Sequence, residues 1–451
     1  MKGKNLTKGN ISKLILSMAI PAAIGMFFQT MFNVTDTFYV GLISTEALAA
    51  MTMAFPIFML IIGLGNGISV GSAALISNFL GENKKEIAKK YAWQAIGFSI
   101  IISAILMILG LTFIDPLLKF MGATVITIAL AKDYALIILY GAPLFILVHT
   151  LNAGLMSIGD TKSLRNALVI GFFLNLILDP FFMYGWLGFP AMGIKGIALC
   201  TVIIQFLSMI YLFIKVIKSK IISFDKIKNV IPNLKFYKNI AKQGFPASLN
   251  MIIMSVGMII LMYFLKAFGD AAIAAWGVAS RIEQIIGLPA IGLGMAMLAI
   301  SGQNNGAKKY TRIKQALNTS LKYGLYMILT GAILIIIFAK QLITFFTADP
   351  QVIAIGIIAL RISAITIFGH MLFQINSTTL QGLKKPLIPM FLALFKQFII
   401  PISFFFLFIK ILNLGIIGIW LGLMLGTFIA AFVLSYIVRR KLNRLITNKI
   451  N

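Results

Sequence analysis

Twelve long apolar segments fill this chain, and each is long enough to cross a lipid bilayer as a helix. A spanning helix needs about 20 mostly apolar residues, and it satisfies its backbone hydrogen bonds internally. The predicted spans cover residues 14–40, 47–79, 91–114, 131–158, 164–187, 193–217, 239–267, 271–301, 314–339, 352–380, 386–410 and 414–438. The sequence therefore predicts an all-α polytopic membrane protein with twelve transmembrane helices.

The scarcity of charge supports this class. Of 451 residues, 60% are hydrophobic and 11% are charged, whereas about a quarter of the residues of a soluble domain are charged. The net charge of +27 would suggest nucleic acid on a soluble chain. Here the basic residues fall between apolar spans, so topology explains them better and we expect no nucleic-acid partner. The single cysteine, Cys200, is expected to be a packing residue, and without a Cys/His cluster we expect no cofactor.

The basic loops predict the orientation of the chain. Basic clusters precede the first span and then follow every second span, while the alternate loops at 113–130, 185–192 and 345–352 are nearly free of them. The clusters lie within residues 2–13, 84–90, 162–165, 218–242, 308–314, 384–385 and 439–444. The positive-inside rule therefore places both termini in the cytoplasm. Because the first apolar segment is long and contains Pro21, we expect a retained helix rather than a signal peptide.

The second half of the chain repeats the first. One constant shift without a gap aligns Pro21 with Pro246, Gly67 with Gly292, Gly81 with Gly306 and Lys84 with Lys309. The ungapped register argues against chance similarity between apolar segments. Each half holds six spans, an even number, so a pseudo-two-fold axis along the membrane normal is predicted, as in alternating-access transporters. The predicted domains are an N-lobe (1–217), a cytoplasmic basic linker (218–238) and a C-lobe (239–451).

Two acids lie inside spans of the first half. Asp36 is near the end of the first span, where an ionised carboxylate must find a partner, reach water or take up a proton. Either it is hydrated at the membrane boundary or it belongs to a working site. Asp179 lies in the fifth span, and Asn175, four residues earlier, shares its helix face. At about 1.5 Å per residue, both acids and Thr201 reach a similar depth.

Two carboxylates, an amide and a hydroxyl at one depth predict a cation-coupling site. Their oxygens suit a hard monovalent cation such as Na⁺. They could equally hold a proton, because desolvation and a neighbouring like charge both favour a protonated carboxyl. The coupling ion is therefore H⁺ or Na⁺, and the site consists of Asp36, Asn175, Asp179 and Thr201. The alternative for Asp179 is that Asp179-Pro180 only ends or kinks a helix.

The second half does not repeat these acids. Its only acid within a span is Glu283, two residues after Arg281, and residues two apart do not face each other on a helix. Glu283 either lines the cavity and attracts cations or belongs to a buried ion-pair network. His149 and His370 lie near apolar faces, and we expect each to be a lone packed histidine.

Taken together, the motifs of this chain resemble those of the multidrug and toxic compound extrusion (MATE) family over nearly its whole length. No single motif is specific to this family, but the order and spacing of the motifs within twelve spans are specific to it. The motifs are Pro21 with Thr35-Asp36-Thr37-Phe38-Tyr39-Val40-Gly41, Gly81-Glu82-Asn83, Asn175-x-x-x-Asp179-Pro180, Gly193-x-x-Gly196 with Ala198 and Thr201, and Gly302-Gln303-Asn304-Asn305-Gly306-Ala307.

The resemblance implies two six-helix lobes that export amphipathic, often cationic small molecules across the bilayer in exchange for Na⁺ or H⁺. It also implies roles for individual residues. The counterparts of Asp36, Asn175, Asp179 and Thr201 form the cation site, with Tyr134 nearby, Asn152 in the cavity and a hinge at Pro21. Asn33, Arg281 and Glu283 are further cavity candidates. We expect a monomer in the plasma (inner) membrane of a prokaryote.

The chain departs from the branch of the family whose cation site lies in the second lobe. That branch has an acid about nine residues after the proline of the seventh helix, where this chain has Ser255, and another in the tenth helix, where Leu360 to Leu380 has none. This favours coupling through the first lobe. The alternative function is a flippase for lipid-linked sugars. Flippases of this kind use a cluster of cavity arginines for pyrophosphate, for which this chain offers Arg281 and Arg361.

An enzyme is not expected, because the sequence offers no metal-ligand spacing and no nucleophile with a base. No P-loop motif is present in the sequence, so ATP is not expected to drive transport directly.

Overall fold

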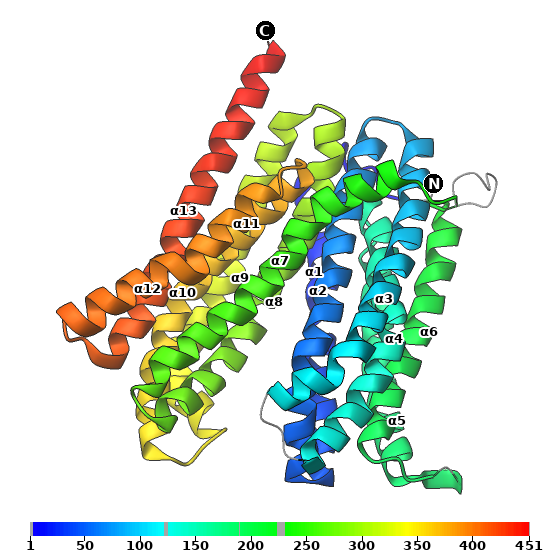
Figure 1. Ribbon diagram of the computed structural model, residues 1–451. Helices are drawn as coiled ribbons and strands as arrows, with labels where there is room; N and C mark the ends of the chain where they lie inside the picture. The colour runs from blue at the N-terminus through cyan, green and yellow to red at the C-terminus, as the bar shows by residue number, and fades with distance from the viewer. Residues whose placement is uncertain (1–2, 121–124, 189, 223–230, 451) are drawn as a thin grey trace. The chain divides into compact units, whose positions relative to one another are not determined.

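The computed structural model describes residues 3–120, 125–188, 190–222 and 231–450, and it is helical throughout the regular elements of these ranges (Figure 1). The first half contains α1 (Ile11–Ile43), α2 (Thr45–Gly81), α3 (Lys85–Phe120), α4 (Val125–Ser157), α5 (Lys162–Tyr184), η1 (Trp186–Gly188) and α6 (Ile194–Ser219). The second half contains α7 (Leu234–Lys266), α8 (Asp270–Gly306), α9 (Tyr310–Thr344), α10 (Pro350–Gly382), α11 (Leu387–Leu394), η3 (Phe395–Ile399), α12 (Ile400–Phe405), η4 (Phe406–Ile411) and α13 (Gly415–Ile450).

Within the described ranges, twelve helical segments are long and apolar enough to cross a membrane, which confirms the predicted twelve spans. The eleventh is the composite segment Leu387–Ile411. Several helices are longer than their predicted spans; α13, for example, continues to Ile450 although the apolar segment ends near residue 438. Hydropathy marks where the lipid ends, whereas arginine, lysine and leucine continue a helix into water without difficulty.

The described structure forms two compact units. Unit 1 contains Met1–Asn5 and Ile24–Ser248, and unit 2 contains Leu6–Ala23 and Leu249–Asn451. Helices α1 and α7 therefore each contribute to both units. The constant shift of the sequence repeat relates the two changeover points, after Ala23 and after Ser248. The units are defined by contacts, whereas the predicted lobes are defined by the sequence repeat.

Repeated glycines explain these shared helices. In unit 1, a Cβ on Gly67 of α2 would lie 2.8 Å from the carbonyl oxygen of Gly244 in α7. In unit 2, a Cβ on Gly292 of α8 would overlap the carbonyl oxygen of Ala19 in α1. Only a residue without a side chain lets two helix backbones approach so closely. The repeat therefore makes the same helix contact once in each unit.

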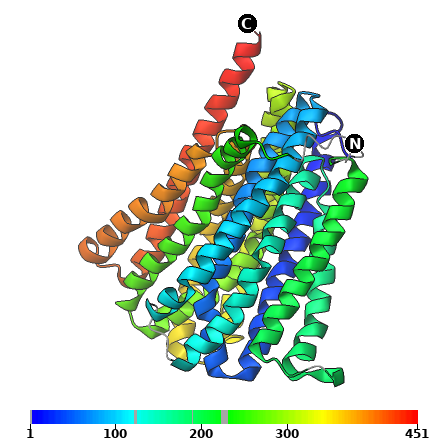
Figure 2. The same cartoon turned by 45° about the vertical axis from the view of Figure 1, so that its right-hand side comes forward.

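The remaining helices pack in the same pattern in both units. In unit 1, α4 packs against α2, α3 and α6, and α5 packs against α6. In unit 2, α10 packs against α8, α9 and α13, and α12 packs against α13. In Figures 1 and 2 alike, the orange eleventh span lies along the red α13. The internal repeat predicted from sequence is therefore also a repeat of packing.

The eleventh span is the least regular helix of unit 2. Two π-helical segments, η3 and η4, interrupt it on either side of α12, which carries Pro401 at its start. Short π-helical segments occur frequently at functional sites, because each one rotates the side chains that follow it.

Candidate functional site

The predicted coupling residues converge in unit 1 around Asp36. Its side chain is only 4% exposed. Asn175 Nδ2 donates a 2.7 Å hydrogen bond to Asp36 Oδ1, and Thr201 Oγ1 lies 3.2 Å from Asp36 Oδ2. The alternative in which Asp36 is merely hydrated at the membrane boundary is therefore wrong, because the carboxyl group is enclosed by α5 and α6.

Asp179 has the fewest hydrogen-bond partners of the polar residues at this site. It is fully buried, and it lies close enough to Asp36 for the two carboxyl groups to interact electrostatically. Among the described residues, neither Asp179 oxygen nor Asn175 Oδ1 has a hydrogen-bond partner. Helix α5 continues through Pro180 to Tyr184, so Asp179 does not end a helix. The site thus offers three buried oxygens that need a proton or a cation.

Helix α6 reaches this site because of two glycines. Gly193 adopts φ of +53° just before the helix, a conformation that suits glycine. A Cβ on Gly196 would lie 2.7 Å from the carbonyl carbon of Phe182 in α5, so the helices approach backbone to backbone three residues after Asp179. Thr201 lies five residues beyond Gly196, and its hydroxyl reaches Asp36 Oδ2 at 3.2 Å.

Thr201 has a choice of acceptors. Its hydroxyl lies 3.1 Å from the Ile197 carbonyl oxygen as well as 3.2 Å from Asp36 Oδ2, and a hydroxyl has one hydrogen to donate. When that hydrogen is directed to Ile197, the Thr201 oxygen keeps its lone pairs for a cation. Thr201 can therefore serve either a carboxylate or a bound cation without leaving its rotamer.

Apolar and aromatic side chains enclose the site. Phe32, Cys200 and Ile204 form a buried cluster, and Leu174, Leu178 and Phe182 pack against it. Tyr134 of α4 is 5% exposed and interacts electrostatically with both acids. Cys200 is the packing residue predicted from sequence, and it also touches Asp179. This dry shell strengthens any charge interaction inside it.

A residue named in the sequence only as part of a motif also fixes the geometry. The Tyr39 hydroxyl donates a 3.1 Å hydrogen bond to the Leu176 carbonyl oxygen of α5. Tyr39 follows Asp36 by three residues and therefore lies on the same side of α1. Together with the Asn175 bond, it ties α1 to α5 at two levels. Helical spacing from Asp36 was the signal that could have identified it.

The arrangement suits a proton or a small hard cation. Two carboxyl groups, an amide oxygen and a hydroxyl are ligands for Na⁺ rather than for a transition metal. The described part of the chain contains no group of three or more His, Cys, Asp or Glu residues placed to hold a metal ion.

The remaining predicted residues are divided between the two units. Asn152 of α4 is 5% exposed, and its Oδ1 has no hydrogen-bond partner among the described residues. Asn33 and Arg281 are exposed. Pro21 lies inside α1, in the part that belongs to unit 2. The structure thus brings Tyr134 to the acids, whereas among the described residues no side-chain hydrogen bond joins Asn33 or Asn152 to Asp36.

The prediction of a lone packed histidine was wrong for His370. Its Nε2 lies 3.6 Å from Glu283 Oε1, and its Nδ1 lies 2.8 Å from Lys396 Nζ. His149 instead faces Gly65, where an added Cβ would lie 3.0 Å from the imidazole. Lys396 was not among the residues predicted from sequence, although a lysine ten residues into a mostly apolar span was a visible signal.

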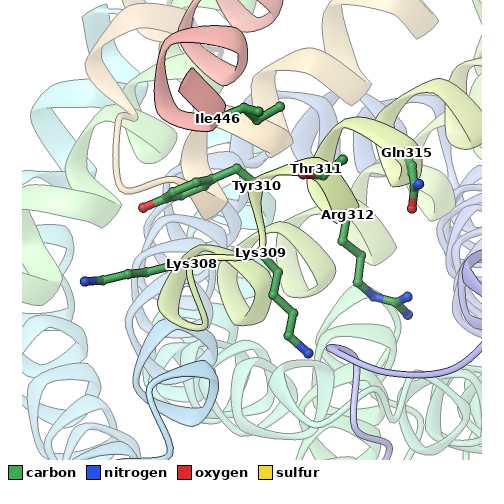
Figure 3. Close-up of a pocket in the computed structure, with 7 residues that line it drawn as sticks. All are labelled: Lys308, Lys309, Tyr310, Thr311, Arg312, Gln315 and Ile446. Atoms are coloured by element: carbon green, nitrogen blue, oxygen red, sulfur yellow. The ribbon is translucent and has the colours of Figure 1, made fainter. Parts of the chain in front are cut away.

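A pocket of about 450 Å³ lies at the turn between α8 and α9. It is lined by Lys308, Lys309, Tyr310, Thr311, Arg312, Gln315 and Ile446, and in Figure 3 Lys308 points away from Lys309 and Arg312. Lys309 donates to the Thr7 carbonyl oxygen, and Arg312 donates to those of Lys8 and Gly9. Lys309 and Arg312 therefore hold the segment before α1.

The chain is similar to known transporters over most of its length. The chain is 28% identical over 427 residues to the probable multidrug resistance protein YoeA of Bacillus subtilis, covering 92% of this chain and 91% of that protein. It is 31% identical over 352 residues to the FAD transporter of Shewanella oneidensis, covering 77% of each. A solved structure, the outward-facing conformation of a multidrug resistance MATE family transporter, has a TM-score of 0.93 at 28% identity, with 99% of each chain covered.

The MatE family model matches residues 21–181 and again residues 246–407. These two stretches begin at Pro21 and Pro246, the residues that the sequence repeat aligns. Because the match covers most of both halves, this chain belongs to the MatE family, whose members are transporters and not enzymes.

Proposed function

We propose that this chain is a secondary active multidrug efflux antiporter. It exports amphipathic, mostly cationic compounds in exchange for H⁺ or Na⁺ by alternating access. Its multidrug resistance relatives support efflux of small molecules. The observation that carries the ion coupling is the pair of buried, unpartnered carboxylate oxygens of Asp179 beside Asp36.

The site links ion binding to conformation through the cost of buried charge. With one proton or Na⁺ bound, the pair of Asp36 and Asp179 carries one net negative charge instead of two, and Asn175 and Thr201 can donate hydrogen bonds to the remaining carboxylate. When the ion leaves, two ionised carboxylates face each other in a dry environment, so the site must admit water or rearrange. An ion that binds one conformation better than the other shifts their populations. In a two-lobed transporter, that shift moves the cavity from one face of the membrane to the other.

The same oxygens would serve either ion. Na⁺ would be held by the Asp179 carboxylate, Asn175 Oδ1 and the Thr201 hydroxyl oxygen. A proton would reside on either carboxyl group of the pair. The proposal places the cation site in the first lobe; at the position that the repeat aligns with Asp36, the second half has the apolar Leu261.

We further propose a monomer in the plasma (inner) membrane of a prokaryote, with both termini in the cytoplasm. The support for the orientation is the placement of the basic clusters at alternate ends of the spans. The pocket residues Lys308, Lys309 and Arg312 belong to one of these clusters.

The proposal is tested in proteoliposomes loaded with ethidium, to which a Na⁺ gradient and a pH gradient are applied separately. We expect one gradient to drive export, and Asp36→Asn and Asp179→Asn to abolish it. Asp115→Asn is the matched control, because Asp115 is about half exposed and pairs with Lys132 at 2.9 Å. Export at the wild-type rate by both site variants would show that these acids do not couple transport.

A second candidate is the export of flavin nucleotides, supported by the similarity to the FAD transporter of Shewanella oneidensis. Ethidium and FAD supplied to the same proteoliposomes distinguish the two candidates.

The flippase alternative is distinguished in the same preparation. It requires movement of a lipid-linked sugar together with no export of any dye.

A further inference from the structure

Three ionisable side chains from three spans meet in unit 2, and the proposed coupling site uses none of them. Lys396 comes from η3, His370 from α10 and Glu283 from α8. Lys396 Nζ lies 2.8 Å from His370 Nδ1, and His370 Nε2 lies 3.6 Å from Glu283 Oε1. Ionisable residues within membrane spans are costly and usually mark substrate or ion pathways.

The hydrogen-bonding chemistry of Lys396 and His370 determines where the charges lie among these three side chains. A lysine ammonium can only donate, so His370 Nδ1 accepts and the imidazole hydrogen is on Nε2, on the side of Glu283. A neutral imidazole therefore separates the positive charge from the negative one. Among the described residues, no carboxylate lies within ion-pair distance of Lys396.

Lys396 is thus a cation whose direct contacts are neutral, while Glu283 attracts it from beyond the imidazole. Besides His370, its ammonium lies 5.0 Å from the centre of the Phe373 ring. An anionic oxygen is a much stronger partner for an ammonium than an imidazole or a ring face. Within a membrane span, a lysine whose direct hydrogen-bond partner is neutral has unused capacity to bind an anion.

Protein atoms cover these three side chains only in part. The His370 side chain is 42% exposed and that of Glu283 is 17% exposed, while Lys396 is half-buried. The π-helical segment that carries Lys396 is also held in place. Its next residue, Gln397, packs so closely on Gly257 of α7 that an added Cβ there would overlap the amide.

We propose that Lys396 binds the anionic group, a phosphate or a carboxylate, of an amphipathic organic anion that the transporter carries. His370 gives up its hydrogen bond with Lys396 and remains beside Glu283. Glu283, beyond the imidazole, keeps the empty site electrically neutral. The inference rests on the proposed transport function, and it adds organic anions to the expected cationic substrates.

The test compares flavin mononucleotide (FMN) with riboflavin, which differ by one phosphate group. Their binding to the full chain in detergent is measured by flavin fluorescence polarisation, without an ion gradient. We expect FMN to bind the wild type at least about tenfold more tightly, as one charge-assisted hydrogen bond implies. Lys396→Gln should abolish this preference, whereas Lys396→Arg should retain most of it. Lys410→Gln, at an exposed lysine of the same span, should leave it unchanged.

Equal affinity of the wild type for FMN and riboflavin would overturn the proposal, as would an unchanged FMN preference in Lys396→Gln. The arginine variant controls for loss of folding, because it keeps the charge and the side-chain length. Failure of the transport function is a separate outcome. It would appear as no gradient-driven ethidium export by a wild type that still prefers FMN.

Discussion

Asn175 Nδ2 donates a 2.7 Å hydrogen bond to Asp36 Oδ1, which joins α5 to α1 at the buried acid pair. This bond commits the amide nitrogen of Asn175 to Asp36, while its oxygen is left without a partner beside Asp179. One amide thus stabilises the carboxylate of Asp36 and offers an acceptor to an ion at Asp179. The two acids therefore have different surroundings although they share one site.

Removing this amide should impair coupling more than folding. In Asn175→Ala, Asp36 loses a hydrogen bond to a charged group, worth about 1.5–3 kcal/mol, so we expect gradient-driven ethidium export to fall by about tenfold or more. Asn166→Ala, nine residues earlier in α5, is the control. Asn166 bonds to Arg165 and Tyr211, and its loss should leave export near the wild-type rate. Equal losses in both variants would contradict the assigned role.

The coupling ion should stabilise the protein. Because a ligand that binds the folded state raises its melting temperature, we expect the wild type to melt at a higher temperature when Na⁺ replaces K⁺ or when the pH is lowered. Asp179→Asn should lose this response, because the amide neither takes up a proton nor supplies a negative charge. Thermal unfolding in detergent across both titrations measures the effect. A wild type that responds to neither ion would argue against an ion site here.

The close approach of α5 and α6 should depend on Gly196. A Cβ there would lie 2.7 Å from the Phe182 carbonyl carbon, so Gly196→Ala must move α6 and Thr201 with it. We expect a loss of stability of about 1–3 kcal/mol, typical of overpacking, together with slower export. Gly277→Ala in α8 is the control, because an added Cβ there meets no atom within 4 Å. Thermal unfolding of the two variants tests the difference.

The repeated glycines should be equally sensitive in the two units. Gly67→Val and Gly292→Val each place a side chain against the backbone of a neighbouring helix, so we expect both to reduce the yield of folded protein. Gly287→Val, in open space on α8, should be tolerated. Size-exclusion profiles of the purified variants provide the measurement. Normal folding of either buried variant would show that the helix contact can relax.

Much of this architecture followed from the sequence alone. Hydropathy determined the twelve spans, because the thickness of a bilayer sets the length of an apolar helix. The constant shift determined the repeat, and α4 and α10 now show the same packing in their own units. Depth followed from the rise per residue, so Asp36, Asp179 and Thr201 were placed at one level. That reasoning needed no knowledge of which way a side chain points.

The tertiary structure determined which side chains meet, which the depth of a residue in the membrane does not specify. Helices that are apolar all round give no indication of which face packs inward, so sequence did not reveal that Asn175 bonds to Asp36. It also did not reveal that His370 lies between Glu283 and Lys396, three residues far apart in the chain. The sharing of α1 and α7 between the units was equally hidden. Rotation about a helix axis and the choice of neighbour are fixed by packing between helices, and a single hydropathy pattern records neither.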